Sequence, residues 1–380
     1  MRLVEDKTQC CGCSACVESC PVKAISMIVD EEGFAYPSIN KNICIGCGIC
    51  KQVCAFKKTN PLKEQSYWEL KSKNQEIRSR SRSGGAFFEL AKSVIQEGGI
   101  VYGVGLVNGT HVQYCRGETL DECKAMQGSK YVECSANGIM HSVYEDLKLN
   151  KKVLFSGTAC QIAGLKSYIA RQKTINMDGL LTVDIICHGV PSQKIYYSYI
   201  KFLEKKYKGK ISEFKFRDKK YGWRYHIESF VINGKVYIKD TYAGMFYSNY
   251  FLRPSCGSCP FSSFDRPADI TIGDFLGVNN VRNNFDDNKG VSVVIVNSPK
   301  GEEYIRTIMP CMDSWKLTKE LCIQPNMEKP SYIPDDRQKA WDCYLKSSFR
   351  TFLMKYGRYD FAHKIKWNFV DLPKIKRDKM

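Results

Sequence analysis

Eight cysteines near the N-terminus occur in two copies of one spacing, and this feature restricts the chain more than any other. The copies are Cys10-x2-Cys13-x2-Cys16-x3-Cys20 and Cys44-x2-Cys47-x2-Cys50-x3-Cys54. Two residues between cysteines let a tight loop present three thiolates to one iron–sulfur cubane, and the fourth cysteine is donated across to the other cluster. The spacing therefore predicts a pair of [4Fe–4S] clusters, which transfer electrons one at a time.

The crossed donation assigns a ligand set to each cluster. We expect one cluster to be held by Cys10, Cys13, Cys16 and Cys54, and the other by Cys44, Cys47, Cys50 and Cys20. Pro21 follows the first run, as in bacterial two-cluster ferredoxins, whereas Ala55 stands at the matching place in the second. Disulfides need an oxidising compartment, and zinc sites seldom repeat so dense a run of cysteines, so iron–sulfur clusters are the better prediction.

Composition and the first residues bear on the class of protein and its location. The chain has 380 residues, 43% hydrophobic and 26% charged, which suits a protein of two or three domains with real cores. No stretch approaches the ~20 apolar residues that a membrane-spanning helix needs, and the short mixed segment before the first cysteine does not resemble a signal peptide. Since 19 cysteines without an export signal indicate a reducing interior, we expect a cytoplasmic protein.

The net charge of +17 raises the question of an anionic partner. The basic residues are scattered and do not accompany a recognised nucleic-acid fold, so no nucleic-acid partner is expected. An electron donor or acceptor protein, either ferredoxin-like or a subunit of a redox enzyme, is a more natural partner. The basic residues of 331–380 allow a peripheral membrane contact without a transmembrane segment.

Hydrophobic periodicity and its breaks divide the chain into five parts. We expect an α+β, multidomain chain. It begins with a two-cluster ferredoxin-type domain over 1–58, which is followed by a polar and basic linker over 59–82. An α/β core then comes in two parts, 83–180 and 181–330, and a basic helical tail over 331–380 ends the chain. The second part of the core is predicted to be rich in β-strands.

The core begins with a helix and a strand. Apolar residues recur at helical spacing over Ala86–Gln96, and Ile100–Leu106 has the character of a strand. Gly103 and Gly105 lie within that strand without a third glycine, so we reject a Rossmann fingerprint there.

Further along, a buried strand over Lys152–Phe155 leads through a Gly-Thr turn into a helix over residues 159–170. This is a geometry that binds anions, because unpaired amides and the helix dipole point outward. Leu180–Ile186 is predicted to be another buried strand. Asn233-Gly234 separates two later strands and predicts a type I′ hairpin turn.

A third set of cysteines lies in the core. Cys256 and Cys259 form a C-x2-C pair in a turn-rich stretch, while Cys160 begins a helix and Cys187 ends a strand. Three interpretations compete: a third [4Fe–4S] cluster, a zinc site, or free thiols with Cys160 as a low-pKa nucleophile at its helix N-terminus. Spacing alone does not choose among them.

Several further motifs occur in order along the core, and they are Ser83-Gly84-Gly85, Gly128-Ser129-Lys130-Tyr131, Ser156-Gly157-Thr158-Ala159-Cys160-Gln161, Cys187-His188-Gly189-Val190-Pro191-Ser192, Cys256-x2-Cys259 and Ala268-Asp269-Ile270-Thr271-Ile272-Gly273-Asp274. Together they resemble the coenzyme F420 hydrogenase/dehydrogenase beta-subunit family from about residue 80 to 310. The resemblance implies a flavin-binding core that holds FAD and a third [4Fe–4S] cluster at Cys160, Cys187, Cys256 and Cys259. Ala159 stands where the family usually has proline.

The same motifs supply the candidate site residues. Glycines let a backbone approach a pyrophosphate, and Lys130 could neutralise its charge, although any single glycine is more often a turn former. His188 is the candidate for proton delivery, with a structural hydrogen-bonding role as the alternative. The remaining cysteines, Cys11 among them, are expected to be small buried hydrophobic residues. The candidate cofactor-binding residues are Ser83, Gly84, Gly85, Gly128, Ser129, Lys130, Tyr131, Gly157, Thr158 and Gln161.

Taken with the resemblance, these residues predict an iron–sulfur flavoprotein oxidoreductase. The clusters would exchange single electrons with a partner protein, and FAD would exchange two electrons with a small organic substrate. The alternative is an electron-transfer subunit that relays electrons to a partner enzyme without substrate chemistry of its own.

Overall fold

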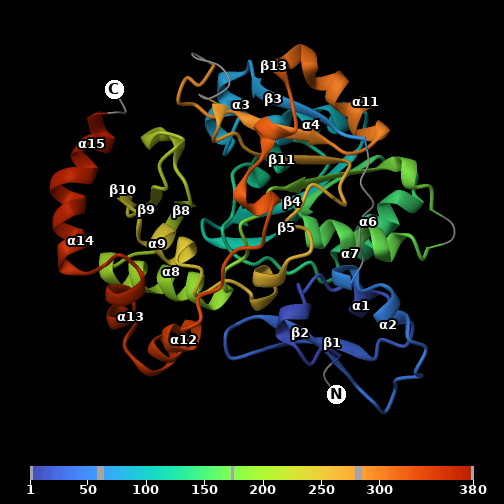
Figure 1. The fold of residues 1–380 in the computed structure, drawn as a ribbon, viewed down its shortest axis with the longest axis horizontal. Coiled ribbons are helices and arrows are strands. Elements are labelled where there is room, and N and C mark those ends of the chain that lie inside the picture. The colour runs from blue at the N-terminus through green and yellow to red at the C-terminus, as the bar shows by residue number, and fades with distance from the viewer. Residues whose placement is uncertain (1–2, 58–63, 173–174, 279–284, 378–380) are drawn as a thin grey trace.

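The fold is described from a computed structural model, which places residues 3–57, 64–172, 175–278 and 285–377. An N-terminal iron–sulfur-type module, coloured blue in Figure 1, lies directly beneath helices of a larger α/β body. The C-terminal helices, coloured red, run along the side of the body next to a small second sheet.

The two cysteine runs of the module have the same backbone. Gly12 and Gly46 both have a φ of +69°, and the helices that follow, α1 (Ala15–Glu18) and α2 (Ile49–Gln52), both start after a left-handed residue. Glycine is the residue that adopts such a φ most readily, and glycine stands at three of these four positions. Strands β1 (Ile25–Val29) and β2 (Ala35–Ile39) pair antiparallel between the runs.

An eight-stranded sheet forms the centre of the body, in the order β13-β3-β12-β11-β7-β6-β4-β5. The four middle strands are parallel to one another, and the strands on either side are antiparallel to their neighbours. The parallel strands are β4 (Ile100–Val107), β6 (Val153–Thr158), β7 (Leu180–Ile185) and β11 (Ile270–Asp274), and the others are β3 (Ser66–Ser72), β5 (His111–Gly117), β12 (Ser292–Val296) and β13 (Met312–Leu317).

Helices cover both faces of this sheet, as parallel strands require. Helices α4 (Ala86–Gln96) and α11 (Pro299–Ile308) pack on one face with Leu154, while α6 (Ile139–Lys148) and α7 (Ala159–Ile169) pack on the other with Phe155. Neighbouring residues of one strand thus enter opposite cores. The short helix α5 (Leu120–Cys123) closes the edge at β5.

The expected linker over 59–82 is wrong for its described part, residues 64–82. Ser66–Ser72 form β3, which pairs with both β12 and β13, and Gln75–Arg80 form α3. The polar and basic composition of this stretch concealed the strand, although Leu70 at its centre is completely buried. The rest of the expected linker falls largely on residues 58–63, which lie outside the described residues.

A second, three-stranded sheet follows α8 (Gln193–Tyr207) and consists of β8 (Ile211–Lys215), β9 (Glu228–Ile232) and β10 (Lys235–Lys239). Asn233 and Gly234 both have positive φ angles, of 50° and 72°, which confirms the predicted type I′ turn between β9 and β10. Helix α9 (Thr241–Tyr247) continues the chain toward the cysteine pair at 256–259.

The C-terminal region is helical, as predicted, but its first half is not a tail. The helices are α12 (Arg337–Lys346), α13 (Phe349–Tyr356), α14 (Phe361–Lys366), a π-helical segment (Trp367–Asp371) and α15 (Leu372–Arg377). Trp341, Phe352 and Leu353 are completely or almost completely buried in the largest core of the body. These apolar residues, spread among many lysines, fix α12 and α13 to the body. In the part of the chain that the structure places, no helix combines the length and the apolar character needed to cross a bilayer.

One arginine of the body holds the module in place. The fully buried Arg253 donates from Nε to the carbonyl oxygen of Cys10 and from Nη2 to that of Ala35, each at 2.7 Å. Its Nη1 pairs with Glu133, and its guanidinium lies 4.4 Å from the ring centroid of Tyr36. The module and the body therefore share a core instead of standing apart on a linker.

We predict that Arg253→Ala lowers the free energy of unfolding by about 3–5 kcal/mol, because it leaves the Glu133 carboxylate buried without its partner. Thermal and urea unfolding followed by circular dichroism measure the change. The control is Arg306→Ala, which removes an ion pair from a side chain that is 77% exposed and should change stability by less than about 1 kcal/mol. Equal effects of the two substitutions would contradict the prediction.

Candidate functional site

The structure brings the ferredoxin-type cysteines together in two crossed sets. Burial first, and then the neighbouring thiols of Cys13, Cys10 and Cys54, raise the pKa of Cys16. The pKa of Cys50 is raised in the same way, chiefly by burial and also by Cys47 and Cys20. The last cysteine of each run therefore lies beside the other run, which is the arrangement that crossed ligation needs.

The two sets differ in their exposure. Cys44 and Cys47 are exposed to solvent. Cys13 instead packs against α7, where a Cβ added to Gly164 would lie 2.9 Å from its sulfur. One cluster position therefore faces solvent and the other faces the body.

The third set of cysteines also converges, in a cavity of the body. Cys160 lies in the first turn of α7, Cys187 follows β7, and Cys256 and Cys259 come from a 3-10 turn (Pro254–Ser258) and the residue after it. Burial first, and then the thiols of Cys160 and Cys259, raises the pKa of Cys187 to about 12. The pKa of Cys256 is raised by burial and by the other three thiols. Residues from three separate segments thus form one group of four thiols.

The spacing of these thiols bears on what they could hold. Among the residues that the structure places, no three His, Cys, Asp or Glu side chains are close enough to chelate a single metal ion. A zinc ion draws its ligands to one centre, whereas each thiolate of a cubane binds a different iron. The ferredoxin-type cysteines likewise form no such group among the described residues.

Cys11 lies between the module and this quartet, although the sequence predicted only a small buried residue there. It lines the same cavity, and its thiol hydrogen-bonds the sulfurs of both Cys13 and Cys160. This interaction with Cys11 is the main cause that lowers the pKa of Cys13. It is also the main cause that lowers the pKa of Cys160, to about 7. Cys11 thus lies between the sulfurs of Cys13 and Cys160, and its pKa is raised by both of them and by burial. The run Cys10-Cys11 contained a signal for this role, since one of two adjacent cysteines cannot belong to the ligand spacing.

Thr158 and Gln161 cap the helix that carries Cys160. The Gln161 Oε1 accepts from the Thr158 backbone N–H at 3.0 Å and from the Tyr114 hydroxyl at 2.9 Å, and the Thr158 hydroxyl lies 3.1 Å from the Cys160 sulfur. Gly157 is small because a Cβ there would come within 2.7 Å of the Tyr114 oxygen. These predicted cofactor residues therefore orient Cys160 within the described structure.

The glycines of the Ser83-Gly84-Gly85 motif permit close packing of the sheet. A Cβ on Gly84 would lie 2.1 Å from the carbonyl oxygen of Leu70 in β3, and Gly85 begins α4 with a φ of +94°. The Ser83 hydroxyl donates to Asp274 Oδ1 at 2.8 Å. The motif thus joins α4 to β3 and points Ser83 toward Asp274.

Lys130 is buried beside its own loop. Its Nζ donates to the carbonyl oxygens of Ala125 and Gln127 at 2.8 and 2.9 Å, and burial lowers its pKa to about 7. Gly128 makes the preceding turn with a φ of +76°, and Ser129 hydrogen-bonds the hydroxyl of Tyr131. In this structure Lys130 is bonded to the backbone and Tyr131 lies near Asp274.

A buried cationic cluster surrounds Asp274, and the sequence did not predict it. Arg82 donates to Asp274 Oδ2 at 2.8 Å, and Arg217 reaches the same oxygen at 3.1 Å. Lys219 donates to the carbonyl oxygens of Arg78 and Ser83. Burial, and then repulsion from Arg82 and Arg78, lowers the pKa of Lys219 to about 7. The site therefore carries more positive than negative charge.

Arg82 also has unused donors. Arg82 as a whole is 9% exposed, yet its Nε and Nη1 atoms have no hydrogen-bond partner among the described residues. A buried charged donor without a partner is costly, and an anion would satisfy it. The serine–arginine stretch that contains Arg82 falls within the predicted linker, and its composition contains no sign of this role.

His188 lies between the quartet and this cationic cluster. Its Nε2 donates to Asn249 Oδ1 at 2.7 Å, and its ring packs 5.5 Å from that of Tyr247. Tyr247 in turn packs 4.5 Å from His226, whose pKa falls to about 4 because of burial and of the nearby Arg82. The hydrogen bond gives His188 a structural role, and its catalytic role remains a prediction.

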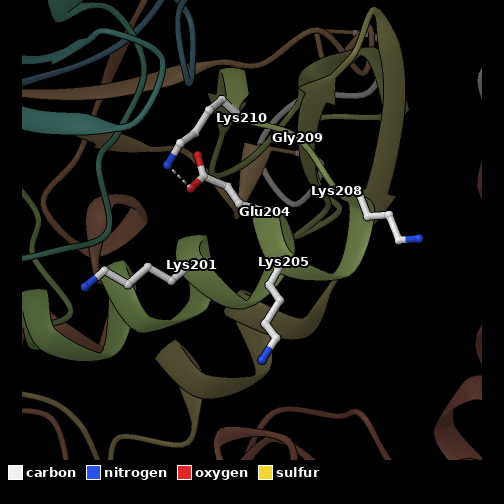
Figure 2. A pocket seen from close by; sticks show the side chains of 6 residues that line it. All are labelled: Lys201, Glu204, Lys205, Lys208, Gly209 and Lys210. Carbon is white, nitrogen blue, oxygen red and sulfur yellow. Dashed lines mark hydrogen bonds and ion pairs between the residues drawn. The ribbon is translucent and has the colours of Figure 1, made fainter.

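A second, open pocket lies at the C-terminal end of α8. Figure 2 shows that its lysine side chains point away from one another, and that Lys210 is paired with Glu204 at 2.8 Å. Diverging, exposed lysines form a solvated surface. This pocket has none of the convergence seen around the cysteines and Arg82.

Comparison with known proteins agrees with this geometry. Residues 9–58 match the model of the 4Fe-4S dicluster domain, and residues 150–312 match that of the C-terminal part of the coenzyme F420 hydrogenase/dehydrogenase beta subunit. The chain therefore contains the C-terminal domain of the coenzyme F420 hydrogenase/dehydrogenase beta-subunit family. This confirms the family that the motifs predicted, with an iron–sulfur module at the N-terminus.

Among solved structures, the chain is similar to a chain of the F420-reducing [NiFe] hydrogenase complex from Methanosarcina barkeri, in a xenon-derivatised form. The identity is 14%, the TM-score is 0.49, and the match covers 73% of this chain and 97% of the other. No curated protein is significantly similar to the chain.

The matched beta-subunit domain contains the whole body quartet, together with His188, Thr158 and Asp274. Arg82, Ser83 and Lys130 precede it in the chain. The cationic cluster is therefore assembled from the beta-subunit domain and the segment between the two matched domains.

We predict that Cys11→Ala lowers the reduction potential of the nearby dicluster-domain cluster by roughly 40 mV, the one-electron equivalent of about 1 kcal/mol for a lost hydrogen bond. A donor to a cluster sulfur stabilises the more negative, reduced form, so its removal shifts the potential downward. Potentiometric titration followed by EPR measures the shift. Cys11→Ser should restore most of it, and Cys322→Ala, in a different core, should leave the potential unchanged.

Proposed function

We propose that the chain is an iron–sulfur flavoprotein oxidoreductase of the cytoplasm. It would couple one-electron transfer through [4Fe–4S] clusters to two-electron oxidation or reduction of a small organic substrate at FAD. The observation that carries the proposal is the continuous line of sulfurs from the exposed Cys44 and Cys47, through Cys13 and Cys11, to Cys160. Such a line has a use only if electrons travel between a surface partner and the body.

The body quartet is the proposed site of a third [4Fe–4S] cluster. Four half-buried thiols from three separate segments have little reason to gather in one cavity unless they bind a common ligand, because their neighbours raise the cost of ionising Cys187 and Cys256. The backbone N–H of Val190 donates to the Cys256 sulfur at 3.4 Å, and the buried Arg266 lines the cavity. Both would stabilise the thiolate charge.

FAD is the proposed group for the cationic cluster, and the residues present fit it. Arg82 Nε and Nη1 are unpaired buried donors among the described residues, and Lys219 is held near Arg82 with its positive charge opposed by burial. A pyrophosphate would accept hydrogen bonds from the unpaired Arg82 atoms and would neutralise the positive charge of Lys219. The flavin supplies exchange between one-electron and two-electron transfer, which clusters alone do not provide.

The side chains between the two sites support this assignment. His188 adjoins Cys187 and packs on Tyr247, which packs on His226 beside Arg82. Because burial lowers the pKa of His226 to about 4, its ring is neutral near pH 7 and can donate one hydrogen bond and accept another in the site. The proposed proton delivery by His188 would use the same row of side chains, from His188 through Tyr247 to His226. The alternative function, a relay without substrate chemistry, needs neither histidine.

We predict that protein prepared without oxygen contains about twelve iron atoms per chain, four for each of three clusters. Cys256→Ala should lower this to about eight, with the spectrum of the dicluster domain retained. Iron and sulfide analysis with EPR measures both. A wild-type protein that saturates at eight iron atoms, or zinc bound at the quartet, would overturn the third cluster.

We predict that Arg82→Gln weakens FAD binding at least about tenfold, because it removes a charged hydrogen bond worth roughly 1.5–3 kcal/mol. Lys130→Gln should have a smaller effect, since the Lys130 amine is already bonded to two carbonyl groups. Titration of the apoprotein by flavin fluorescence gives both constants, and the iron content serves as the folding control. A greater loss in Lys130→Gln would show that Lys130 turns to the pyrophosphate, as the family motif suggests.

A further inference from the structure

We propose that the surface around Cys44 and Cys47 is the docking site for a small, acidic one-electron carrier protein. The inference rests on the proposed function, which requires a surface partner, and it adds where that partner binds and what its charge is. Three independent properties of this surface point to it: access to the cysteines, exposed apolar side chains, and charge of one sign.

The cysteines of one cluster set are the ones exposed on the surface of the module. Cys44 and Cys47 are exposed, and a Cβ added to Gly46 or Gly48 would meet no atom within 4 Å. The other cluster position is covered, because Arg253 packs against Gly12. The cluster position of Cys44 and Cys47 is therefore the more accessible of the two to a partner.

Large apolar side chains stand exposed beside these cysteines. Ile43 and Ile45, on either side of Cys44, are 46% and 64% exposed, and Val22 is 37% exposed. The fourth ligand of the same set, Cys20, directly precedes the segment that carries Val22. An apolar centre of this kind is typical of the middle of a protein interface.

The rim of this surface is basic. Lys23, Lys41 and Lys51 are exposed around it, and the Asn40 N–H donates to the Ala24 carbonyl oxygen at 2.8 Å, which brings the segments of Lys23 and Lys41 together. The sequence contains no Asp or Glu between residues 33 and 63.

The carboxylates of the module lie elsewhere. Asp30, Glu31 and Glu32 occupy the turn between β1 and β2, at the opposite end of the hairpin, and Glu18 accepts from the backbone of Gly138 and His141 in the body. Glu5 and Asp6 precede the first cysteine run, where Asp6 accepts from the Thr8 N–H. The segment that carries Cys44 therefore contributes only positive charge to this surface, and its complement is a protein with an acidic face.

The test measures how fast a reduced acidic ferredoxin bleaches the clusters of the full-length holoprotein in anaerobic stopped flow. At low ionic strength, Lys23→Glu/Lys41→Glu/Lys51→Glu should slow this second-order rate at least about tenfold, because it reverses the steering charge. The difference should shrink as salt is added. Ile43→Ser/Ile45→Ser should slow the reaction at every salt concentration.

The matched control is Lys201→Glu/Lys205→Glu/Lys208→Glu, which makes the same change of net charge on the solvated α8 surface shown in Figure 2. It should react with the ferredoxin within about twofold of the wild-type rate. Equal losses in the two triple variants would mean that only net charge matters and would overturn the docking site, as would no loss in either.

Reduced methyl viologen, a small dye that needs no docking surface, separates failure of this inference from failure of the proposed function. It should reduce wild type and all variants at the same rate. Clusters that neither donor can reduce would contradict the proposed function itself. Slower reduction of the module variant by both donors would show damage to the clusters and overturn the docking assignment.

Discussion

The position of the iron–sulfur module depends on the guanidinium of Arg253. It is completely buried, bonded to the backbone of Cys10 and Ala35, paired with Glu133, and stacked on Tyr36. A planar group with several fixed donors can satisfy all these partners at once, which an ammonium cannot. Because Cys10 and Cys11 are adjacent in the chain, the same contact sets the distance from the module to the thiols of the body. Electron transfer and stability therefore depend on one side chain.

Cys11 shows how a residue outside a ligand motif can still matter to it. Its thiol reaches the sulfurs of Cys13 and Cys160, which belong to different parts of the molecule. A donor shared by two acceptors links their electrostatics, because a change of charge on one alters the hydrogen bond to the other.

The sequence allowed some elements to be predicted and not others, for physical reasons. The cysteine spacing, α4 over Ala86–Gln96 and the turn at Asn233-Gly234 depend on local geometry, and each matches the structure. Strand β3 was missed because its polar residues resemble a linker until its partners from distant segments are present. Arg82 and Arg253 could not be assigned for the same reason: a buried arginine is recognised by what surrounds it. Gly84 was assigned to a ligand, whereas the close approach it permits is to Leu70.

The place of β3 in the sheet has a consequence for how the chain is made. The strand comes early in the sequence, yet both of its neighbours, β12 and β13, follow it by more than 200 residues. Contacts within the module are local and can form early, whereas a strand that must wait for such distant partners orders late. The module can therefore fold on a growing chain while the body is still open. Only after β12 and β13 have been synthesised does the sheet close, bringing Gly84 and the nearby Arg82 to their final positions.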